Sequence, residues 1–217
     1  MPDFAHLRER MVERQIAARG IRDQDILNAF REVPRELFVA EKYAAAAYED
    51  GPLPIEAGQT ISQPYIVAFM IDAAEVRPGD RVLEIGAGSG YAAAVMSRIA
   101  ARVVAIERQP DLVRIARERL HRLGCDNLLV IEGDGTCGSP DHAPFDAILA
   151  AASGSHVPPP LIDQLAPGGR LVMPIGDPHA AQELVKVTKR PDGTTSEERL
   201  CGVRFVPLIG EEGWTDD

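Results

Sequence analysis

An alternating run of glycines, directly after a short apolar segment, is the part of the sequence best suited to hold a ligand. Residues 84–90 read Glu-Ile-Gly-Ala-Gly-Ser-Gly, and a predicted helix follows them. Glycine lets the backbone turn sharply and approach a ligand closely. The first turn of the helix offers free N–H groups and a partial positive charge. Both features suit a ligand with a carboxylate or another anionic group.

Two acidic residues stand where the next two apolar segments end. Glu107 closes the segment 102–107, and Asp134 closes the segment 128–134. A carboxylate at the position of Glu107 can accept hydrogen bonds from both hydroxyls of a ribose. Ligands in open α/β sheets bind beyond the carboxyl ends of the strands, so we expect the glycines, Glu107 and Asp134 to line one crevice. The alternative is that Glu107 merely ends a strand and Asp134 merely lies in a loop, and that neither carboxylate binds a ligand.

The spacing of the glycines narrows the class of ligand. The dinucleotide fingerprint needs a glycine where this chain has Tyr91, the phosphate-binding loop needs Gly-Lys-Ser/Thr, and the nucleophile elbow needs glycines on both sides of Ser89. A nucleoside with a carboxylate tail and no pyrophosphate fits, and S-adenosylmethionine is such a molecule. We expect its amino-acid part against the glycine loop, its ribose on Glu107 and its adenine near Asp134, with Glu84 holding its ammonium group.

Five short apolar segments must carry these loops in a sheet. They alternate with helices or loops, which predicts parallel strands with helices on both faces and right-handed crossovers. Two further apolar segments flank a turn and predict an antiparallel pair at the C-terminus. The sequence therefore predicts an α/β fold, a doubly wound, mostly parallel Rossmann-like sheet. The seven segments are 81–86, 102–107, 128–134, 145–151, 169–176, 183–189 and 199–208.

The N-terminal third reads as a helical extension. Apolar residues at helical spacing predict a helix over 4–18 and a second helix that Asp23 caps and Pro34 closes. Residues 48–64 are rich in glycine and proline and have no clear period, so we expect a long loop. Long ordered loops tend to carry function. A third helix is expected over 65–74.

Composition argues against several other classes of protein. The net charge of −10 gives little basis for phosphate contacts, so we expect no nucleic-acid partner. The charged N-terminus has no signal-peptide core, and no apolar run approaches the ~20 residues of a membrane helix. The cysteines, Cys125, Cys137 and Cys201, are odd in number and lack CxxC or metal-ligand spacing, which predicts reduced thiols and no metal site. We therefore expect a cytoplasmic protein.

Several segments resemble a known family. The Glu-x-Gly-x-Gly-x-Gly loop, with an acidic end on the second strand, resembles the class I S-adenosylmethionine-dependent methyltransferase superfamily over residues 80–175. Upstream, Gly58-Gln59-Thr60-Ile61-Ser62-Gln63-Pro64 is similar to the loop of bacterial protein-L-isoaspartate O-methyltransferases. Further segments that resemble this family, in the family's order, are 33–39, 82–86, 144–148, 164–169 and 203–208.

This resemblance implies an activity and a set of site residues. Members transfer a methyl group from S-adenosylmethionine to the free α-carboxylate of L-isoaspartyl residues in damaged proteins, which starts repair through a succinimide. Ser62 would be the active-site serine. The implied cofactor-binding residues are Thr60, Ile61, Glu84, Gly86, Ala87, Gly88, Gly90, Glu107, Arg108, Asp134 and Gly135. The implied substrate-binding residues are Thr60, Ser62, Val203, Phe205 and Val206.

The resemblance also implies how the chain is organised. Residues 1–217 would form a single methyltransferase domain, with a helical extension and active-site loop over 1–79, a cofactor-binding core over 80–176 and C-terminal strands over 177–217. We expect a monomer whose partners are isoaspartyl-containing proteins and peptides, and neither nucleic acid nor a membrane.

One segment departs from the family pattern, and several alternatives stay open. Residues 151–158 read Ala-Ala-Ser-Gly-Ser-His-Val-Pro, where many members have Thr-Ala-Ala followed by prolines. Because this loop lies beside the expected active site, another carboxylate or a small molecule is an alternative methyl acceptor. A nicotinamide-dependent oxidoreductase is disfavoured by Tyr91, and a cofactor-binding module without catalysis is the third alternative. Ser62 is also well placed to cap the helix that begins near Pro64.

Overall fold

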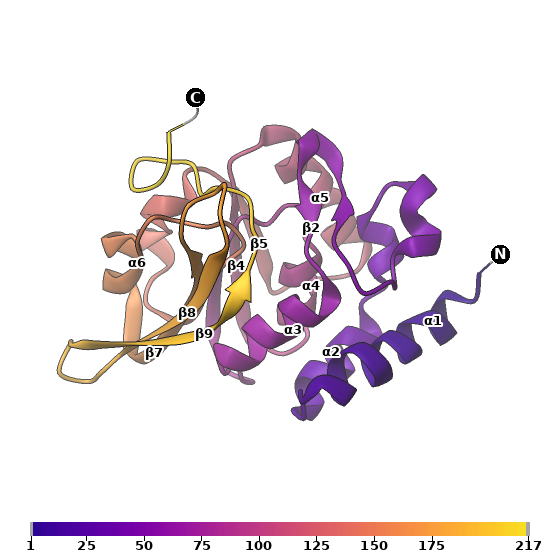
Figure 1. Ribbon diagram of the computed structural model, residues 1–217, viewed down its shortest axis with the longest axis horizontal. Helices are drawn as coiled ribbons and strands as arrows, with labels where there is room; N and C mark the ends of the chain where they lie inside the picture. Colours follow the sequence, from indigo (N-terminus) through magenta and orange to yellow (C-terminus); the bar gives the residue numbers. More distant parts are fainter. Residues whose placement is uncertain (1, 216–217) are drawn as a thin grey trace.

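Seven strands form one sheet in the computed structural model, which describes residues 2–215 (Figure 1). Their order is β5-β4-β3-β6-β7-β8-β9, and neighbours from β5 to β7 pair in parallel. The pairs β7/β8 and β8/β9 are antiparallel. The predicted Rossmann-like sheet with an antiparallel C-terminal pair is therefore confirmed. The strands are β3 (Arg81–Ile85), β4 (Arg102–Glu107), β5 (Leu128–Glu132), β6 (Phe145–Ala150), β7 (Leu165–Ile175), β8 (Gln182–Lys189) and β9 (Thr195–Val203).

Successive side chains along each strand point to opposite faces of the sheet, and in the central strands both sets of side chains are buried. Val82 and Val103 belong to one core cluster, whereas their neighbours Leu83 and Val104 belong to the other. This arrangement explains why the central strands read as nearly continuous apolar runs in the sequence.

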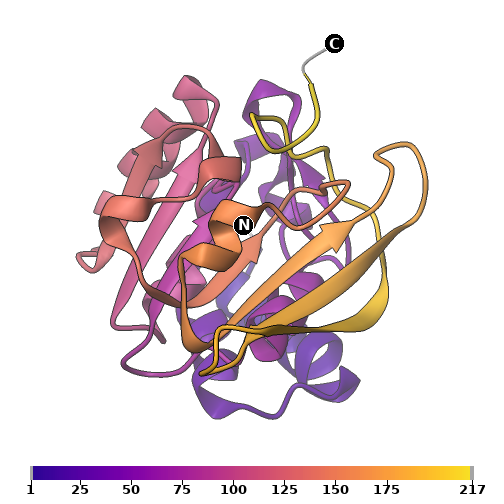
Figure 2. The same ribbon diagram turned by 90° about the vertical axis from the view of Figure 1, so that its left-hand side faces the viewer.

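Helices cover the two faces unequally. The first core cluster packs against five helices, and the second packs against one short helix with Leu161 at its centre. Figure 2 shows the sheet between these layers. The helices on the first face are α1 (Phe4–Met11), α2 (Gln24–Glu32), α3 (Pro64–Ala73), α4 (Tyr91–Ser97) and α5 (Pro110–Arg122), and α6 (Pro159–Asp163) lies on the second.

The N-terminal extension follows the sequence prediction with one difference. Asp23 caps α2, since its Oδ1 accepts hydrogen bonds from the N–H groups of Asp25 and Ile26 at 2.8 and 3.2 Å. The first helix, however, is α-helical only to Met11, then widens into a π turn over Val12–Ile16. Apolar spacing alone does not reveal this change, which accompanies burial of Met11, Val12 and Ile16 in the same core.

The chain order reverses at β3, which has β4 on one side and β6 on the other. Such a switch point opens a crevice at the carboxyl ends of the strands, where α/β proteins bind ligands. The predicted loop over 48–64 reaches this end and contains a small hairpin, β1 (Leu53–Pro54) with β2 (Thr60–Ile61). After β9, the C-terminal segment also turns back over this end of the sheet (Figures 1 and 2).

The longest helix within residues 2–215, α5, has 13 residues. No helix in that range combines the length and the apolar character that a bilayer span needs.

Candidate active site

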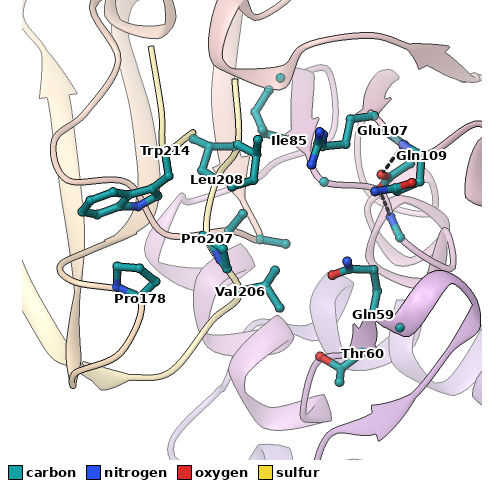
Figure 3. A pocket seen from close by; sticks show the side chains of 18 of the residues that line it. Gln59, Thr60, Ile85, Glu107, Gln109, Pro178, Val206, Pro207, Leu208 and Trp214 are labelled. Carbon is teal, nitrogen blue, oxygen red and sulfur yellow. Dashed lines mark hydrogen bonds between the residues drawn. The ribbon is translucent and has the colours of Figure 1, made fainter. Parts of the chain in front are cut away.

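A cavity of about 650 Å³ lies at the switch point of the sheet. Its wall is built by the loop after β3, the ends of β4 and β6, and residues 58–60, 177–179 and 206–209. Figure 3 shows Glu107 and Gln109 on one side of this cavity, Trp214 and Pro178 on the opposite side, and Gln59 and Thr60 along a third. Segments far apart in the sequence therefore converge on one hollow, as the sequence predicted for its central part.

The glycine loop makes the floor of this cavity by adopting backbone conformations that other residues avoid. Gly86, Gly88 and Gly90 have φ values of 83°, 53° and 87°. The N–H groups of Gly86 and Ala87 both donate to the carbonyl of Ile106, at 2.8 and 3.0 Å, which holds the loop against the end of β4. A side chain at these positive φ angles would strain the turn. The glycines thus form the sharp turn that the sequence predicted.

Glu107 is held by the backbone on two sides. Its Oε2 accepts a hydrogen bond from the Gly88 N–H at 2.8 Å, and its Oε1 accepts one from the Gln109 N–H at 2.9 Å (Figure 3). The side chain is nearly buried and lines the cavity. Each carboxylate oxygen has two acceptor positions, so both oxygens keep capacity for further donors such as ribose hydroxyls.

A second, smaller cavity of about 40 Å³ joins Glu84 to the segment with Ser62. Glu84 is only 2% exposed, and its Oε2 has no hydrogen-bond partner within residues 2–215. Burial raises the pKa of this carboxyl well above its usual range, and the charge of Glu107 adds to the effect. A buried acceptor without a donor is costly. An ammonium group of a bound ligand would satisfy it, so Glu84 fits the amino-acid end of S-adenosylmethionine.

Ser62 lies in the wall of this smaller cavity together with Thr60 and Ile61. The N-cap residue of α3 is Gln63, and it is followed by Pro64 in the first turn. The alternative interpretation of Ser62 as the helix cap is therefore not what the structure has. The catalytic role of Ser62 stays a prediction.

Asp134 and Gly135 have different relationships to the cavity. Asp134 Oδ1 accepts from the N–H and the hydroxyl of Thr136, and Oδ2 accepts from the Glu211 N–H at 2.7 Å. Although burial acts to raise it, the pKa of Asp134 is lowered overall by these hydrogen bonds. Gly135 lines the cavity, where a Cβ would come within 2.4 Å of Ile85 Cγ2. Asp134 itself lies just outside the lining, so its predicted contact with adenine stays a prediction.

The other predicted residues divide between the two cavities and their surroundings. Gly86, Gly88 and Thr60 line both cavities, Arg108 lines the large one, and Ala87 lines the small one. Gly90 lines neither, but its left-handed conformation begins α4.

Of the predicted substrate residues at the C-terminal end, only Val206 lines the large cavity. Phe205 is instead fixed by Gln182, whose side chain accepts from the Phe205 N–H at 2.6 Å and donates to its carbonyl at 3.0 Å. Val203 is the last residue of β9 and pairs with the same glutamine. A substrate contact of Val203 or Phe205 therefore stays a prediction.

Two parts of the cavity wall escaped the sequence prediction. Residues 177–179 follow β7, and the segment 209–215 contributes Trp214, whose Nε1 donates to the Ser153 carbonyl at 2.9 Å. Neither part has a periodic pattern, and the one available signal was a single tryptophan in a mainly polar tail. These residues close the cavity opposite Glu107.

The loop that departs from the family pattern does border the cavity. Ala151 and Ala152 line it. The Ser153 N–H donates to the Val206 carbonyl, and the Leu208 N–H donates to the Ser153 carbonyl, both at 2.8 Å. The departing loop and the predicted substrate segment are therefore paired into one wall.

Residues 6–213 match the family model described as Protein-L-isoaspartate(D-aspartate) O-methyltransferase (PCMT). This chain belongs to that family. A relative named Protein-L-isoaspartate O-methyltransferase 2, from Pelobacter propionicus, is 56% identical over 207 residues, which cover 95% of this chain and 92% of the relative. The resemblance predicted from residues 58–64 and the other family segments is confirmed.

Two solved structures of the isoaspartate methyltransferase family agree with the fold. One, named protein-L-isoaspartate O-methyltransferase, has a TM-score of 0.86 and 32% identity, and the match covers 94% of this chain and 66% of that one. The other is from Plasmodium falciparum and was determined in complex with S-adenosyl-L-homocysteine. It has a TM-score of 0.80 and 30% identity, and the match covers 93% of this chain and 98% of that one.

Proposed function

We propose that this chain transfers the methyl group of S-adenosylmethionine to the free α-carboxylate of L-isoaspartyl residues in damaged proteins and peptides. The observation that carries the proposal is the family match over residues 6–213. The site supports it, because Ser62, Glu84 and the glycine loop meet at one small cavity that adjoins the larger one. Isoaspartyl-containing proteins and peptides are thus the proposed partners.

The proposed cofactor contacts follow from the chemistry of the groups on the page. The glycine loop and the start of α4 suit a carboxylate, the unpartnered Oε2 of Glu84 suits an ammonium, and the free acceptor positions of Glu107 suit ribose hydroxyls. The bound cofactor supplies a methyl group activated by a sulfonium. The protein's task is to hold this group facing the acceptor.

The acceptor needs orientation and not activation. A carboxyl group with a pKa of about 4 is already ionised at neutral pH, so no general base is required. Ser62 would donate a hydrogen bond to one carboxylate oxygen and so aim the other oxygen at the methyl carbon. Apolar walls from Ile85, Ala151 and Val206 would exclude water and favour a step in which opposite charges cancel.

Repair would continue on the product without the enzyme. Attack of the neighbouring amide nitrogen on the methyl ester expels methanol and closes a succinimide, which then opens by hydrolysis, in part to normal aspartate. The protein need only release the ester.

The cellular setting is proposed on weaker grounds. The net charge of −10 supports a protein without a nucleic-acid partner. The cysteines are odd in number and lack CxxC spacing, which supports a reducing, cytoplasmic location. We propose a monomer, because all the groups assigned above come from one chain.

Methyl transfer from labelled cofactor to an isoaspartyl peptide tests the proposal, with its normal aspartyl twin as the control. We expect volatile label, released as methanol, from the isoaspartyl peptide alone. Labelling of both peptides or of neither would defeat the assigned substrate. Because Ala151 and Ala152 of the loop 151–158 line the cavity, a different carboxylate is the second candidate, and a panel of small carboxylic acids belongs in the same assay. Calorimetric titration with S-adenosylhomocysteine and with NADH separates both candidates from an oxidoreductase.

A further inference from the structure

Arg35 carries a charge into the core, and nothing in the proposed chemistry uses it. It begins the 3-10 turn Arg35–Phe38 and has an exposed fraction of 0%. Its Nε donates to the Ala47 carbonyl at 2.7 Å, but neither Nη1 nor Nη2 makes a hydrogen bond of good geometry within residues 2–215. Burial lowers the pKa of the guanidinium. Burying a cation with so few partners is costly, so its position calls for a physical reason.

The guanidinium lies against the helix that follows the glycine loop. Its carbon is 4.9 Å from the ring centroid of Tyr91, the first residue of α4. Phe30 and Phe38 meet the same ring edge-on, with centroid distances of 6.1 and 5.4 Å. A cation over the face of an aromatic ring is attracted by the negative charge of that face, and more strongly where water is excluded. Arg35 thus fixes the ring of Tyr91, which also lines the small cavity.

The other end of the same side chain holds the start of the active-site loop. Ala47, which accepts the Nε hydrogen bond, stands one residue before the loop over 48–63. At the next residue, the Tyr48 carbonyl accepts from Gln15 Nε2 at 2.8 Å, and the Tyr48 hydroxyl donates to Glu36, the neighbour of Arg35. The beginning of the loop is therefore tied to the turn that carries Arg35.

Arg35 consequently stands between two segments that meet again at the reaction site. One contact leads through Tyr91 to the glycine loop and the cofactor side. The other leads through Ala47 to the loop that carries Ser62, which lies on the acceptor side of the small cavity. An unbranched apolar side chain such as methionine would fill much of the space, but it would make neither the directed hydrogen bond nor the contact of a cation with the ring.

We propose that Arg35 is a positioning residue for methyl transfer, which sets the placement of the Ser62 loop relative to the helix after the glycine loop. The inference rests on the proposed function, because it concerns the alignment of cofactor and acceptor. In-line transfer is sensitive to such alignment, and a displacement of about 1 Å can cost on the order of a hundredfold in rate. The cofactor would still bind, because its proposed contacts with the glycine loop, Glu84 and Glu107 remain in place.

The test compares Arg35→Met and Arg35→Lys with a control of matched burial, Leu161→Ala in α6. Leu161 is fully buried, belongs to the core cluster on the opposite face and lines neither cavity. For each protein we would measure Tm, the Kd of S-adenosylhomocysteine, kcat and KM for the isoaspartyl peptide, and amide exchange in residues 48–63.

We expect Arg35→Met to lower kcat by about tenfold to a hundredfold while peptide KM and cofactor Kd change by less than about threefold. Amide exchange should speed up in residues 48–63. Arg35→Lys should recover part of kcat, because an ammonium retains the charge near the ring of Tyr91. Leu161→Ala should lower Tm by at least as much and leave kcat at the wild-type value. This split distinguishes positioning from a general loss of stability.

Unchanged kcat in Arg35→Met, or a fall in kcat equal to that of Leu161→Ala at equal Tm, would overturn the assignment. If Arg35→Met does not fold, Arg35→Lys and Tyr91→Leu carry the same test, since Tyr91→Leu removes the ring that the cation contacts. Failure of the proposed function is a separate result: the wild-type protein would then show no transfer to the isoaspartyl peptide.

Discussion

The Gly88 N–H donates to Glu107 Oε2 at 2.8 Å, which ties the tip of the glycine loop to the end of the neighbouring strand. The Gln109 N–H holds the other oxygen of the same carboxylate. Glu107 therefore has two tasks, to shape the loop and to offer its remaining acceptor positions to a ligand.

Replacement of Glu107 with glutamine is expected to weaken cofactor binding. The amide nitrogen of the glutamine would replace one carboxylate oxygen and would face a backbone N–H, so that one hydrogen bond is lost. Hydrogen bonds to charged groups contribute about 1.5–3 kcal/mol each. We therefore expect the Kd of S-adenosylhomocysteine to rise at least about tenfold, as measured by calorimetry. Glu132→Gln is the matched control, because Glu132 pairs with Glu107 across the sheet but is exposed and lines neither cavity. Equal weakening in both variants would contradict the role of Glu107.

Removal of the Ser62 hydroxyl should act on turnover. Ser62 lies in the small cavity and is not the cap of α3, so Ser62→Ala should leave the helix intact. We expect kcat for the isoaspartyl peptide to fall by about tenfold or more, because the acceptor carboxylate loses an orienting donor. The Kd of S-adenosylhomocysteine should change little. Parallel losses in kcat and Kd would show that Ser62 serves the cofactor, and Ser155→Ala, at an exposed serine beyond the cavity lining, provides the control.

The strands and the α2 cap could be predicted because their signals are local. Residues such as Val82 and Leu83 alternate between two buried faces, which leaves a continuous apolar run in the sequence. Asp23 binds N–H groups only two and three residues away, so the side chain and its partners are neighbours in the sequence.

Other parts of the site depend on contacts between distant segments. Trp214 enters the cavity wall through a hydrogen bond to Ser153, 61 positions away. No local pattern indicates that Arg35, an ordinary charged residue in sequence, is fully buried over Tyr91. Several residues that the family resemblance predicted line the two cavities, but the part that Asp134 plays in holding the C-terminal segment depends on tertiary contacts.

The raised pKa of Glu84 predicts opposite effects of Glu84→Gln on stability and on cofactor binding. Burial, followed by the charge of Glu107, raises this pKa well above the ordinary 4.5, so the folded state binds a proton that the unfolded state loses. The free energy of unfolding therefore falls as pH rises from the unfolded pKa towards the folded one. Glutamine has no proton to lose. Its Tm should exceed that of the wild type by more at about pH 8 than at about pH 5.

Cofactor binding should respond to Glu84→Gln in the opposite direction. The unpartnered Oε2 is the proposed acceptor for the ammonium of the ligand, so the Kd of S-adenosylhomocysteine should rise in the variant. An arriving ammonium would also lower the pKa of Glu84, and wild-type binding near neutral pH should release protons. Calorimetry in buffers of different ionisation enthalpy measures that release, which should be smaller in the variant. Identical proton release in both proteins would show that the released protons come from a group other than Glu84.

Asp134 should control whether the C-terminal segment closes the cavity. Its carboxylate is ionised at neutral pH, since hydrogen bonds outweigh burial and keep its pKa low, and Oδ2 accepts from the Glu211 N–H. In Asp134→Asn, the amide oxygen can still serve the Thr136 donors, and the amide nitrogen then faces the Glu211 N–H, donor against donor. The segment should loosen from this point towards Trp214. Because Trp214 is the single tryptophan of the chain, its fluorescence reports the change directly. We expect emission at longer wavelength, faster quenching by added acrylamide and a severalfold higher Kd for S-adenosylhomocysteine.

Asp141→Asn, at an exposed position on the 140–142 turn, should leave all three unchanged. Wild-type fluorescence together with a raised Kd would instead mean that Asp134 acts on the cofactor itself, as the family resemblance implies, and not through the segment that covers it.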